Sequence, residues 1–170
     1  MSKNLFDLEY SSILNGKNIL ITGGTGSFGY QILKELRSYK PKKIIIFSRD
    51  ENKQHLMKQE LSDEKISRVI NYVIGDVRDY SRLHTVCADM DIVFHAAALK
   101  QVPPTELYPL EAVYTNVIGS HNLARAAIAR GVSHVVAIST DKAVKPVNTM
   151  GMTKAIQEKI FRSAQYEKNK

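Results

Sequence analysis

Short apolar runs alternate with amphipathic stretches along this chain of 170 residues. The run NILIT at 18–22 is short and mostly apolar, which is typical of a buried strand. Apolar residues then recur at helical spacing over 27–39, and Pro41 separates this helix from a second strand, KIIIF, at 43–47. The pattern therefore predicts a strand, a helix and a strand near the start of the chain.

The same alternation continues to the last residues. Pro103 and Pro104 predict a turn, and Gly131 predicts the end of a long helix. The further predicted elements are a helix capped by Asp50 that runs to about Leu61, a strand at 68–74, a short helix at 80–88, a strand at 91–97, a helix at 109–130, a strand at 132–138 and a helix from about Asn148.

Alternating strands and helices of this kind predict a parallel sheet that is covered by helices on both faces. Right-handed crossovers then give a doubly wound α/β fold with strand order 3-2-1-4-5. In such a fold the ligand crevice lies at the carboxyl ends of the strands. The notable segments of this chain all fall at those ends: 22–29, 48–53, 75–77, 96–100 and 139–142.

Composition limits the class of protein. With 44% hydrophobic and 24% charged residues, the chain is an ordinary globular sequence, long enough for one domain with a core. Its apolar runs are strand-sized, and its start lacks the basic end and long apolar centre of a signal peptide. The single cysteine, Cys87, excludes an internal disulfide and fits a reducing compartment. We therefore expect a cytoplasmic protein with no membrane partner.

The net charge of +7 is scattered along the chain. Nucleic-acid sites need clustered positive charge with stacking aromatic residues, and no basic run here reaches five residues. We therefore expect no nucleic-acid partner. The same charge suits a small anionic ligand such as a nucleotide sugar.

The segment from Thr22 to Gly29 reads TGGTGSFG and joins the first predicted strand to a helix. It contains the Gly-x-Gly-x-x-Gly spacing of dinucleotide-binding Rossmann folds. Glycine allows a tight turn and the close approach of a pyrophosphate, and the helix start supplies amide donors and a favourable dipole. The residues expected to bind the cofactor here are Gly23, Thr25, Gly26, Ser27, Phe28 and Gly29.

The end of the second strand favours NADP over NAD. An NAD site would place an acid against the adenine ribose, whereas this chain has Ser48 and Arg49 there. Arg49 is able to bind a 2′-phosphate in a bidentate manner, and Lys53 lies one helical turn further on. Asp50 fits a helix cap better than a ribose ligand. We expect Ser48, Arg49 and Lys53 to contact the cofactor.

The segment 139–154 reads STDKAVKPVNTMGMTK and carries most of the candidate chemistry. A Ser-Thr pair that closes an apolar strand, followed by Met150-x-x-x-Lys154, resembles the active-site strip of extended short-chain dehydrogenases/reductases. Most of that superfamily has a tyrosine at the Met150 position, whose ionised hydroxyl removes the alcohol proton of the substrate. Methionine has no ionisable proton, so either the site is inactive or the acid–base work has moved to Asp141 and Lys142.

Ser-Thr-Asp-Lys followed by Met-x-x-x-Lys is similar to the inverting UDP-N-acetylglucosamine 4,6-dehydratases of capsule and surface-polysaccharide synthesis. That resemblance implies a lyase that oxidises the sugar transiently at C4, eliminates water across C5 and C6, and returns hydride to C6 with inversion at C5. It implies Asp141 as the acid, and Lys142 is the favoured base, since burial or neighbouring positive charge lowers a lysine pKa. Thr140 belongs to the same strip. Lys154 shares a helix face with Met150 and is expected to contact the nicotinamide ribose.

The superfamily resemblance extends to the other strand ends. Asp76 and Val77 resemble the pair that borders the adenine. Lys100 resembles the lysine that reaches the pyrophosphate, and together with Met150 it is also expected to face the substrate. Small residues at the end of the fourth strand leave room for a cofactor: Ala96, Ala97 and Ala98.

Other polar residues have structural interpretations as well as functional ones. Asn116 matches the active-site asparagine of the superfamily, although a polar helix interior explains it nearly as well. The five histidines show no metal-ligand spacing, so no metal is expected, and His95 is interpreted as a satisfied core or crevice residue. Cys87 fits a core position better than a nucleophile.

The resemblance covers about Gly16 to Phe161, whereas the family continues into further strands and a smaller domain that holds the nucleotide sugar. We expect an N-terminal extension at 1–16 and an NADP-binding Rossmann domain at 17–170, truncated after the Met-x-x-x-Lys helix. The expected substrate is a UDP-sugar, and the full-length protein is expected to form a homo-oligomer. Two alternatives stay open: a nucleotide-sugar 4-epimerase, against which Met150 counts, and a non-catalytic NADP-binding module.

Overall fold

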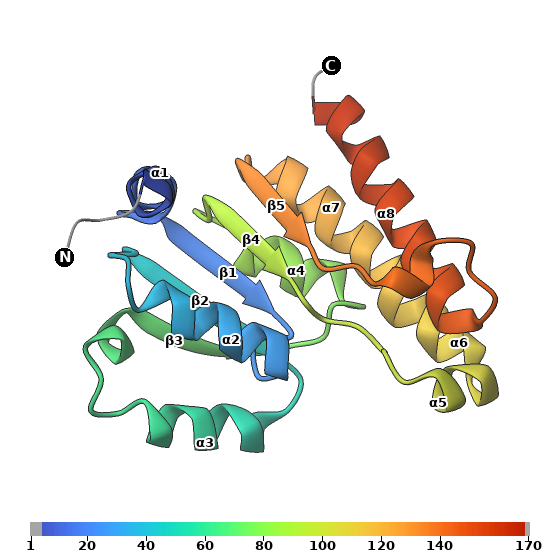
Figure 1. Ribbon diagram of the computed structural model, residues 1–170, viewed down its shortest axis with the longest axis horizontal. Helices are drawn as coiled ribbons and strands as arrows, with labels where there is room; N and C mark the ends of the chain where they lie inside the picture. The colour runs from blue at the N-terminus through green and yellow to red at the C-terminus, as the bar shows by residue number, and fades with distance from the viewer. Residues whose placement is uncertain (1–4, 169–170) are drawn as a thin grey trace.

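The computed structural model describes residues 5–168, which form a five-stranded sheet with helices on both faces (Figure 1). The strand order is β3-β2-β1-β4-β5 and every pair of neighbours is parallel, which confirms the predicted doubly wound fold. The strands are β1 (Asn18–Thr22), β2 (Lys43–Ser48), β3 (Ile70–Ile74), β4 (Ile92–His95) and β5 (His134–Ala137).

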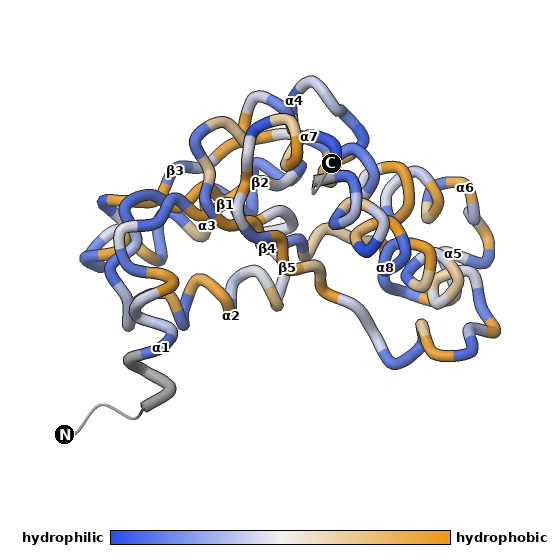
Figure 2. The backbone as a smooth tube through the Cα atoms, turned by 90° about the horizontal axis from the view of Figure 1, so that it is seen from above, coloured by the Kyte–Doolittle hydropathy of each residue, from blue (hydrophilic) through white to orange (hydrophobic). Residues whose placement is uncertain are grey.

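Two pairs of helices enclose the sheet. Helices α2 (Ser27–Leu36) and α3 (Glu51–Glu60) pack on one face, and α4 (Tyr80–Val86) and α7 (Gly119–Ala129) pack on the other. Figure 2 shows the sheet between α2 on one side and α4 with α7 on the other. The sheet is therefore buried on both faces, which explains why its central strands are continuously apolar.

The two faces have separate cores because successive strand residues point in opposite directions. Ile19 and Ile21 of β1 pack with Leu33 of α2, whereas Leu20 packs with Leu83 of α4. Each of these side chains is fully buried, and burial of a large aliphatic side chain contributes about 1.5–3 kcal/mol. This double core holds the carboxyl ends of the strands in a fixed arrangement.

The remaining elements lie before, between and after these layers. Helix α1 (Leu5–Leu14) falls within the predicted extension at 1–16, and residues 1–4 lie outside the described part of the chain. Short 3-10 turns occur at η1 (Lys65–Val69) and η3 (Asp141–Ala143). The last helix is α8 (Thr149–Lys168), which packs against α7.

The predicted turn at Pro103 and Pro104 is wrong. Both prolines lie in the first turn of helix α5 (Val102–Leu107). Proline is tolerated there because the first N–H groups of a helix have no partner inside the helix.

The helix predicted over 109–130 is present but irregular. It comprises α6 (Pro109–Ala112), a π-helical segment η2 (Val113–Ile118) and α7, and the backbone stays helical at both junctions. A π-helical turn widens a helix by one residue, and such turns are frequent at functional sites. Here the segment lies beside the cleft described next.

Candidate functional site

A cleft of about 610 Å³ runs along the carboxyl ends of the strands. It gathers the segments that follow all five strands, as a doubly wound topology requires. Every predicted site residue except Asp141 lines this cleft: Gly23, Thr25, Gly26, Ser27, Phe28, Gly29, Ser48, Arg49, Lys53, Asp76, Val77, Ala96, Ala97, Lys100, Thr140, Lys142, Met150 and Lys154.

Glycine is required at two positions of the loop that lines the cleft, because the backbone there packs too closely for a side chain. Gly23 has a φ of +67°, and a Cβ atom there would lie 2.6 Å from the backbone nitrogen of Ala97. A Cβ atom on Gly29 would lie 2.6 Å from the Cα atom of Gly24, so α2 begins in direct contact with the loop. Gly26 occupies the N-cap of α2 without a capping side chain, which leaves the first amides of the helix available to an anion.

Charged side chains surround the end of β2. Arg49 Nη1 lies 3.8 Å from Asp76 Oδ2, and Arg78 Nη2 lies 2.7 Å from the same oxygen. Burial acts to raise the pKa of Asp76, but the hydrogen bonds and charge of Arg78, together with the charge of Arg49, hold it below its ordinary value. The Asp50 carboxylate accepts from the Lys53 backbone N–H at 2.9 Å, which confirms its interpretation as the cap of α3.

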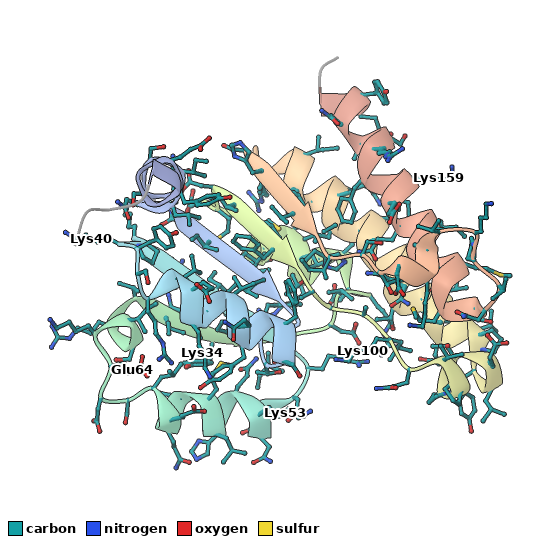
Figure 3. All side chains as sticks on the ribbon, in the orientation of Figure 1. Lys34, Lys40, Lys53, Glu64, Lys100 and Lys159 are labelled. Carbon is teal, nitrogen blue, oxygen red and sulfur yellow. The ribbon has the colours of Figure 1, made fainter. Side chains whose placement is uncertain are left out.

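Both carboxylates at this end of the cleft are paired with cations, since Lys53 Nζ lies 3.5 Å from Asp50 Oδ2 and Arg49 and Arg78 contact Asp76, and the basic side chains stay accessible. The side chain of Arg49 is 54% exposed and that of Lys53 is 64% exposed. Figure 3 shows Lys53 and Lys100 at this edge of the sheet and Lys40 at the opposite edge. A ligand group that enters here meets cationic donors.

Thr140, Asp141 and Lys142 follow β5 at the η3 turn. Thr140 Oγ1 donates to Asp141 Oδ1 at 2.9 Å, and Lys142 Nζ lies 3.8 Å from that oxygen. The hydrogen bond from Thr140 and then the charge of Lys142 lower the pKa of Asp141. The Asp141 side chain is 88% exposed and lies outside the cleft, whereas Lys142 is 49% exposed and lines it.

Helix α8 presents both Met150 and Lys154 to the cleft, as their spacing predicts. Met150 is buried, and Lys154 is only 6% exposed. The Lys154 ammonium donates to the carbonyl oxygen of Ile138 at the end of β5. Burial lowers the pKa of Lys154 to about 8, against the opposing effect of the Glu158 charge.

Lys154 should make the stability of the chain rise from about pH 8 to pH 10.5. The unfolded lysine keeps its proton up to its ordinary pKa of 10.5, whereas the folded one loses it near 8, so the unfolded state binds more protons in this window. Below pH 8 both states are charged and the cost of burying the ammonium is complete. Urea unfolding across this range should show the gain in the parent and its loss in Lys154→Met. The same pH dependence in both proteins would exclude Lys154 as its source.

Asn116 is fully buried behind the cleft and makes hydrogen bonds to two of the segments that flank it. Its amide nitrogen donates to the Leu99 carbonyl at 2.9 Å and to Thr153 Oγ1 at 3.0 Å, and its amide oxygen accepts from the Leu99 N–H at 2.8 Å. It therefore links the π-helical segment to the loop after β4 and to α8. These contacts account for a polar side chain in a helix interior, and an active-site role stays a prediction.

Some lining residues were missed by the sequence analysis. Two of them, Phe47 and Ile138, directly adjoin the predicted segments 48–53 and 139–142, so their position was a usable signal. Thr115 comes from the π-helical segment, which no periodic pattern in the sequence reveals. The missed residues are Phe47, Thr115 and Ile138.

His95 and Cys87 are buried, as expected. His95 Nδ1 lies 2.6 Å from Thr22 Oγ1, and Nε2 lies 3.1 Å from Ser120 Oγ. Burial, followed by the charge of Lys154, lowers the pKa of His95 to about 3, so the ring is neutral. Burial also raises the pKa of the Cys87 thiol to about 12, which fits a core residue. No group of three potential metal ligands occurs among residues 5–168.

A family model described as polysaccharide biosynthesis protein matches residues 19–170. The chain belongs to this family. The match includes every segment that lines the cleft and all five strands, apart from Asn18 at the start of β1.

Curated relatives of this chain have names that describe two different activities. The chain is 50% identical over 153 residues to UDP-N-acetylglucosamine 4,6-dehydratase (inverting) of Campylobacter jejuni. The aligned residues make up 89% of this chain and 45% of the relative. It is 49% identical over 148 residues to UDP-glucose 4-epimerase of Rickettsia bellii, and here the aligned residues make up 85% of this chain and 42% of the relative. The chain thus spans less than half the length of these relatives. The family resemblance is confirmed, but identity alone does not separate the two reactions.

Solved structures agree with the fold. Pen from Bacillus thuringiensis superposes with a TM-score of 0.87 at 44% identity, covering 91% of this chain and 48% of the other. The dTDP-glucose 4,6-dehydratase DesIV of Streptomyces venezuelae, solved with NAD bound, gives a TM-score of 0.78 at 22% identity, covering 87% and 51%. In the described part of our chain, no helix is both long and apolar enough to cross a membrane.

Proposed function

We propose that this chain is the cofactor-binding half of an NADP-dependent, C5-inverting UDP-N-acetylglucosamine 4,6-dehydratase of surface-polysaccharide synthesis. One observation carries the proposal: Lys142, Met150 and Lys154 line a single cleft with the glycine loop. Met150, which shares a face of α8 with Lys154, is a buried methionine at the position of the superfamily tyrosine, so proton transfer must use other groups. The lysines in the cleft are such groups.

The cleft suits a dinucleotide. The backbone amides of the glycine loop and of the uncapped start of α2 would hold the pyrophosphate, and Arg49 and Lys53 would hold a 2′-phosphate. Lys154 would contact the nicotinamide ribose. When bound, such a cofactor supplies reversible hydride transfer.

The residues after β5 would move the protons. Lys142 would take the C5 proton, and Asp141 would give a proton to the C6 hydroxyl as it leaves as water. Both side chains are substantially exposed in the chain alone, so bound sugar and cofactor would have to exclude water from them. Because its lowered pKa keeps Asp141 ionised, the acid role requires substrate binding to raise that pKa. The hydrogen bond from Thr140 would orient the carboxyl group.

A nucleotide-sugar 4-epimerase is the second candidate, because the Rickettsia bellii relative is as similar to this chain as the Campylobacter jejuni one. Both reactions begin with oxidation at C4, and only the dehydratase removes the C5 proton. The family assignment fits both. Assembly into a homo-oligomer and a cytoplasmic location stay predictions for the whole protein.

The test is product formation by this chain fused to the C-terminal region of the Campylobacter jejuni relative. We expect the isolated chain to form no product, because substrate positioning supplies a large share of any rate and the uridine diphosphate site would lie in the remainder. The fusion should convert UDP-N-acetylglucosamine to a 4-keto-6-deoxy sugar, as followed by NMR. A C4 epimer would support the epimerase, and cofactor binding without product would support the non-catalytic module. Turnover by the isolated chain would show that the remainder is not needed.

We expect the chain to bind NADP more tightly than NAD. Arg49→Ala should weaken NADP binding by about 1.5–3 kcal/mol, the range for a charged hydrogen-bonded contact, and leave NAD binding unchanged. Calorimetry measures both affinities. Arg68→Ala, which removes an exposed arginine from the η1 turn, serves as the control. Equal affinity of the parent for the two cofactors would contradict the assignment.

A further inference from the structure

We infer that Gln54, which lies behind the cleft wall, is a specificity-determining residue that holds the Ser48 hydroxyl as a hydrogen-bond donor for a 2′-phosphate. The inference rests on the NADP binding proposed above. Gln54 belongs to α3 and is 5% exposed, and Ser48 ends β2 and is 8% exposed. Ser48 lines the cleft, whereas Gln54 does not.

The contacts of Gln54 determine which way its amide faces. Its Nε2 atom lies 3.0 Å from the Val73 carbonyl oxygen, 3.2 Å from the Ser48 carbonyl oxygen and 2.9 Å from Ser48 Oγ. Two of these partners are carbonyl oxygens, which only accept hydrogen bonds, so the amide must present its nitrogen to them. One amide proton goes to Val73, and the other is shared by the two oxygens of Ser48. The Ser48 hydroxyl oxygen is therefore an acceptor toward Gln54.

This arrangement leaves the Ser48 proton for the cleft. A serine hydroxyl has a single proton, and no described residue accepts it from Ser48. The two nearby carbonyl oxygens already receive the Gln54 amide protons. The hydroxyl therefore donates into the space lined by Arg49 and Lys53.

Three donors of this kind favour a phosphate over a ribose hydroxyl. A phosphate oxygen accepts from all of them, whereas a ribose hydroxyl also needs an acceptor for its own proton. The nearby carboxylates are engaged: Asp50 caps α3, and Asp76 binds Arg78 and Arg49.

Loss of the Gln54 amide would release the Ser48 hydroxyl from its fixed direction. In Gln54→Met the Ser48 hydroxyl oxygen loses the amide donor that orients it, whereas the Ser48 carbonyl oxygen keeps the Gly75 N–H at 3.0 Å. The Ser48 proton is then shared between the cleft and the nearby carbonyl oxygens, which no longer receive the Gln54 amide protons. The 2′-phosphate would lose one donor while Arg49 and Lys53 stay in position.

Calorimetry with two nucleotide fragments tests this inference: adenosine 2′,5′-bisphosphate and adenosine 5′-monophosphate. Gln54→Met and Ser48→Ala should each weaken bisphosphate binding about tenfold, the effect of one hydrogen bond to a charged group, and leave monophosphate binding unchanged. The double variant should lose no more than either single one, since both remove the same donor. Gln59→Met is the matched control, because Gln59 is an exposed glutamine of the same helix.

The outcomes separate this inference from the proposed function. Equal binding of both fragments by the parent would overturn the NADP assignment itself. Bisphosphate binding that is not weakened in Ser48→Ala or in Gln54→Met would overturn the role of Gln54 and leave NADP selection standing, as would additive losses in the double variant. If Gln54→Met does not fold, Gln54→Asn, whose shorter amide withdraws from Ser48, takes its place with the same expected loss.

Discussion

Lys142→Ala should abolish exchange of the substrate C5 proton with solvent deuterium in the fused enzyme. Lys142 lines the cleft beside Met150 and Lys154, and its ammonium lies 3.8 Å from the Asp141 carboxylate. A shortened side chain removes the base that the proposal assigns to the C5 proton, so the elimination across C5 and C6 should not proceed. Incubation in deuterium oxide followed by NMR of the sugar measures the exchange.

Met150→Ala is the control for this prediction. Met150 lies on the same wall of the cleft but has no ionisable proton, so its loss should leave the exchange in place. Exchange that persists in Lys142→Ala would remove Lys142 from the role of base. Asp141, a water molecule or Lys154, whose pKa is about 8, would then be the remaining candidates.

Gly23→Ala should unfold the glycine loop and abolish cofactor binding. A Cβ atom at Gly23 would lie 2.6–2.8 Å from three backbone atoms of Ala96 and Ala97, and the end of a central strand cannot move away. Gly131 has the same φ of +67°, but a Cβ atom there would have no neighbour within 4 Å. The comparison of the two variants therefore separates steric overlap from backbone strain.

Gly131→Ala should lower the free energy of unfolding by roughly 1–2 kcal/mol, the cost of a left-handed residue with a side chain. Gly23→Ala should lose roughly 1–3 kcal/mol more through overpacking. Urea unfolding measures both losses, and calorimetry with NADP measures the binding. Equal losses in the two variants would show that the close approach of the loop to β4 has no energetic consequence.

Patterns within a few residues of one another determine much of this protein. The run at 18–22, the glycine spacing and the alternation of strands with helices are local, and right-handed crossovers turn them into one strand order. Because parallel strands end at one edge, motifs at separate strand ends must meet there, as Ser48 and Thr140 do in the cleft. The fold and nearly all of the lining were therefore predictable from the sequence alone.

Contacts between residues far apart in the chain were decided only by the tertiary structure. No spacing in the sequence predicts that Arg49 pairs with Asp76 or that Gln54 reaches Val73, since both depend on how neighbouring strands and a helix pack. The same holds for Lys154, whose lowered pKa comes from burial between α8 and the end of β5. Side-chain spacing determines which edge of the sheet a residue reaches, but its partner and its charge are set by the atoms that surround it there.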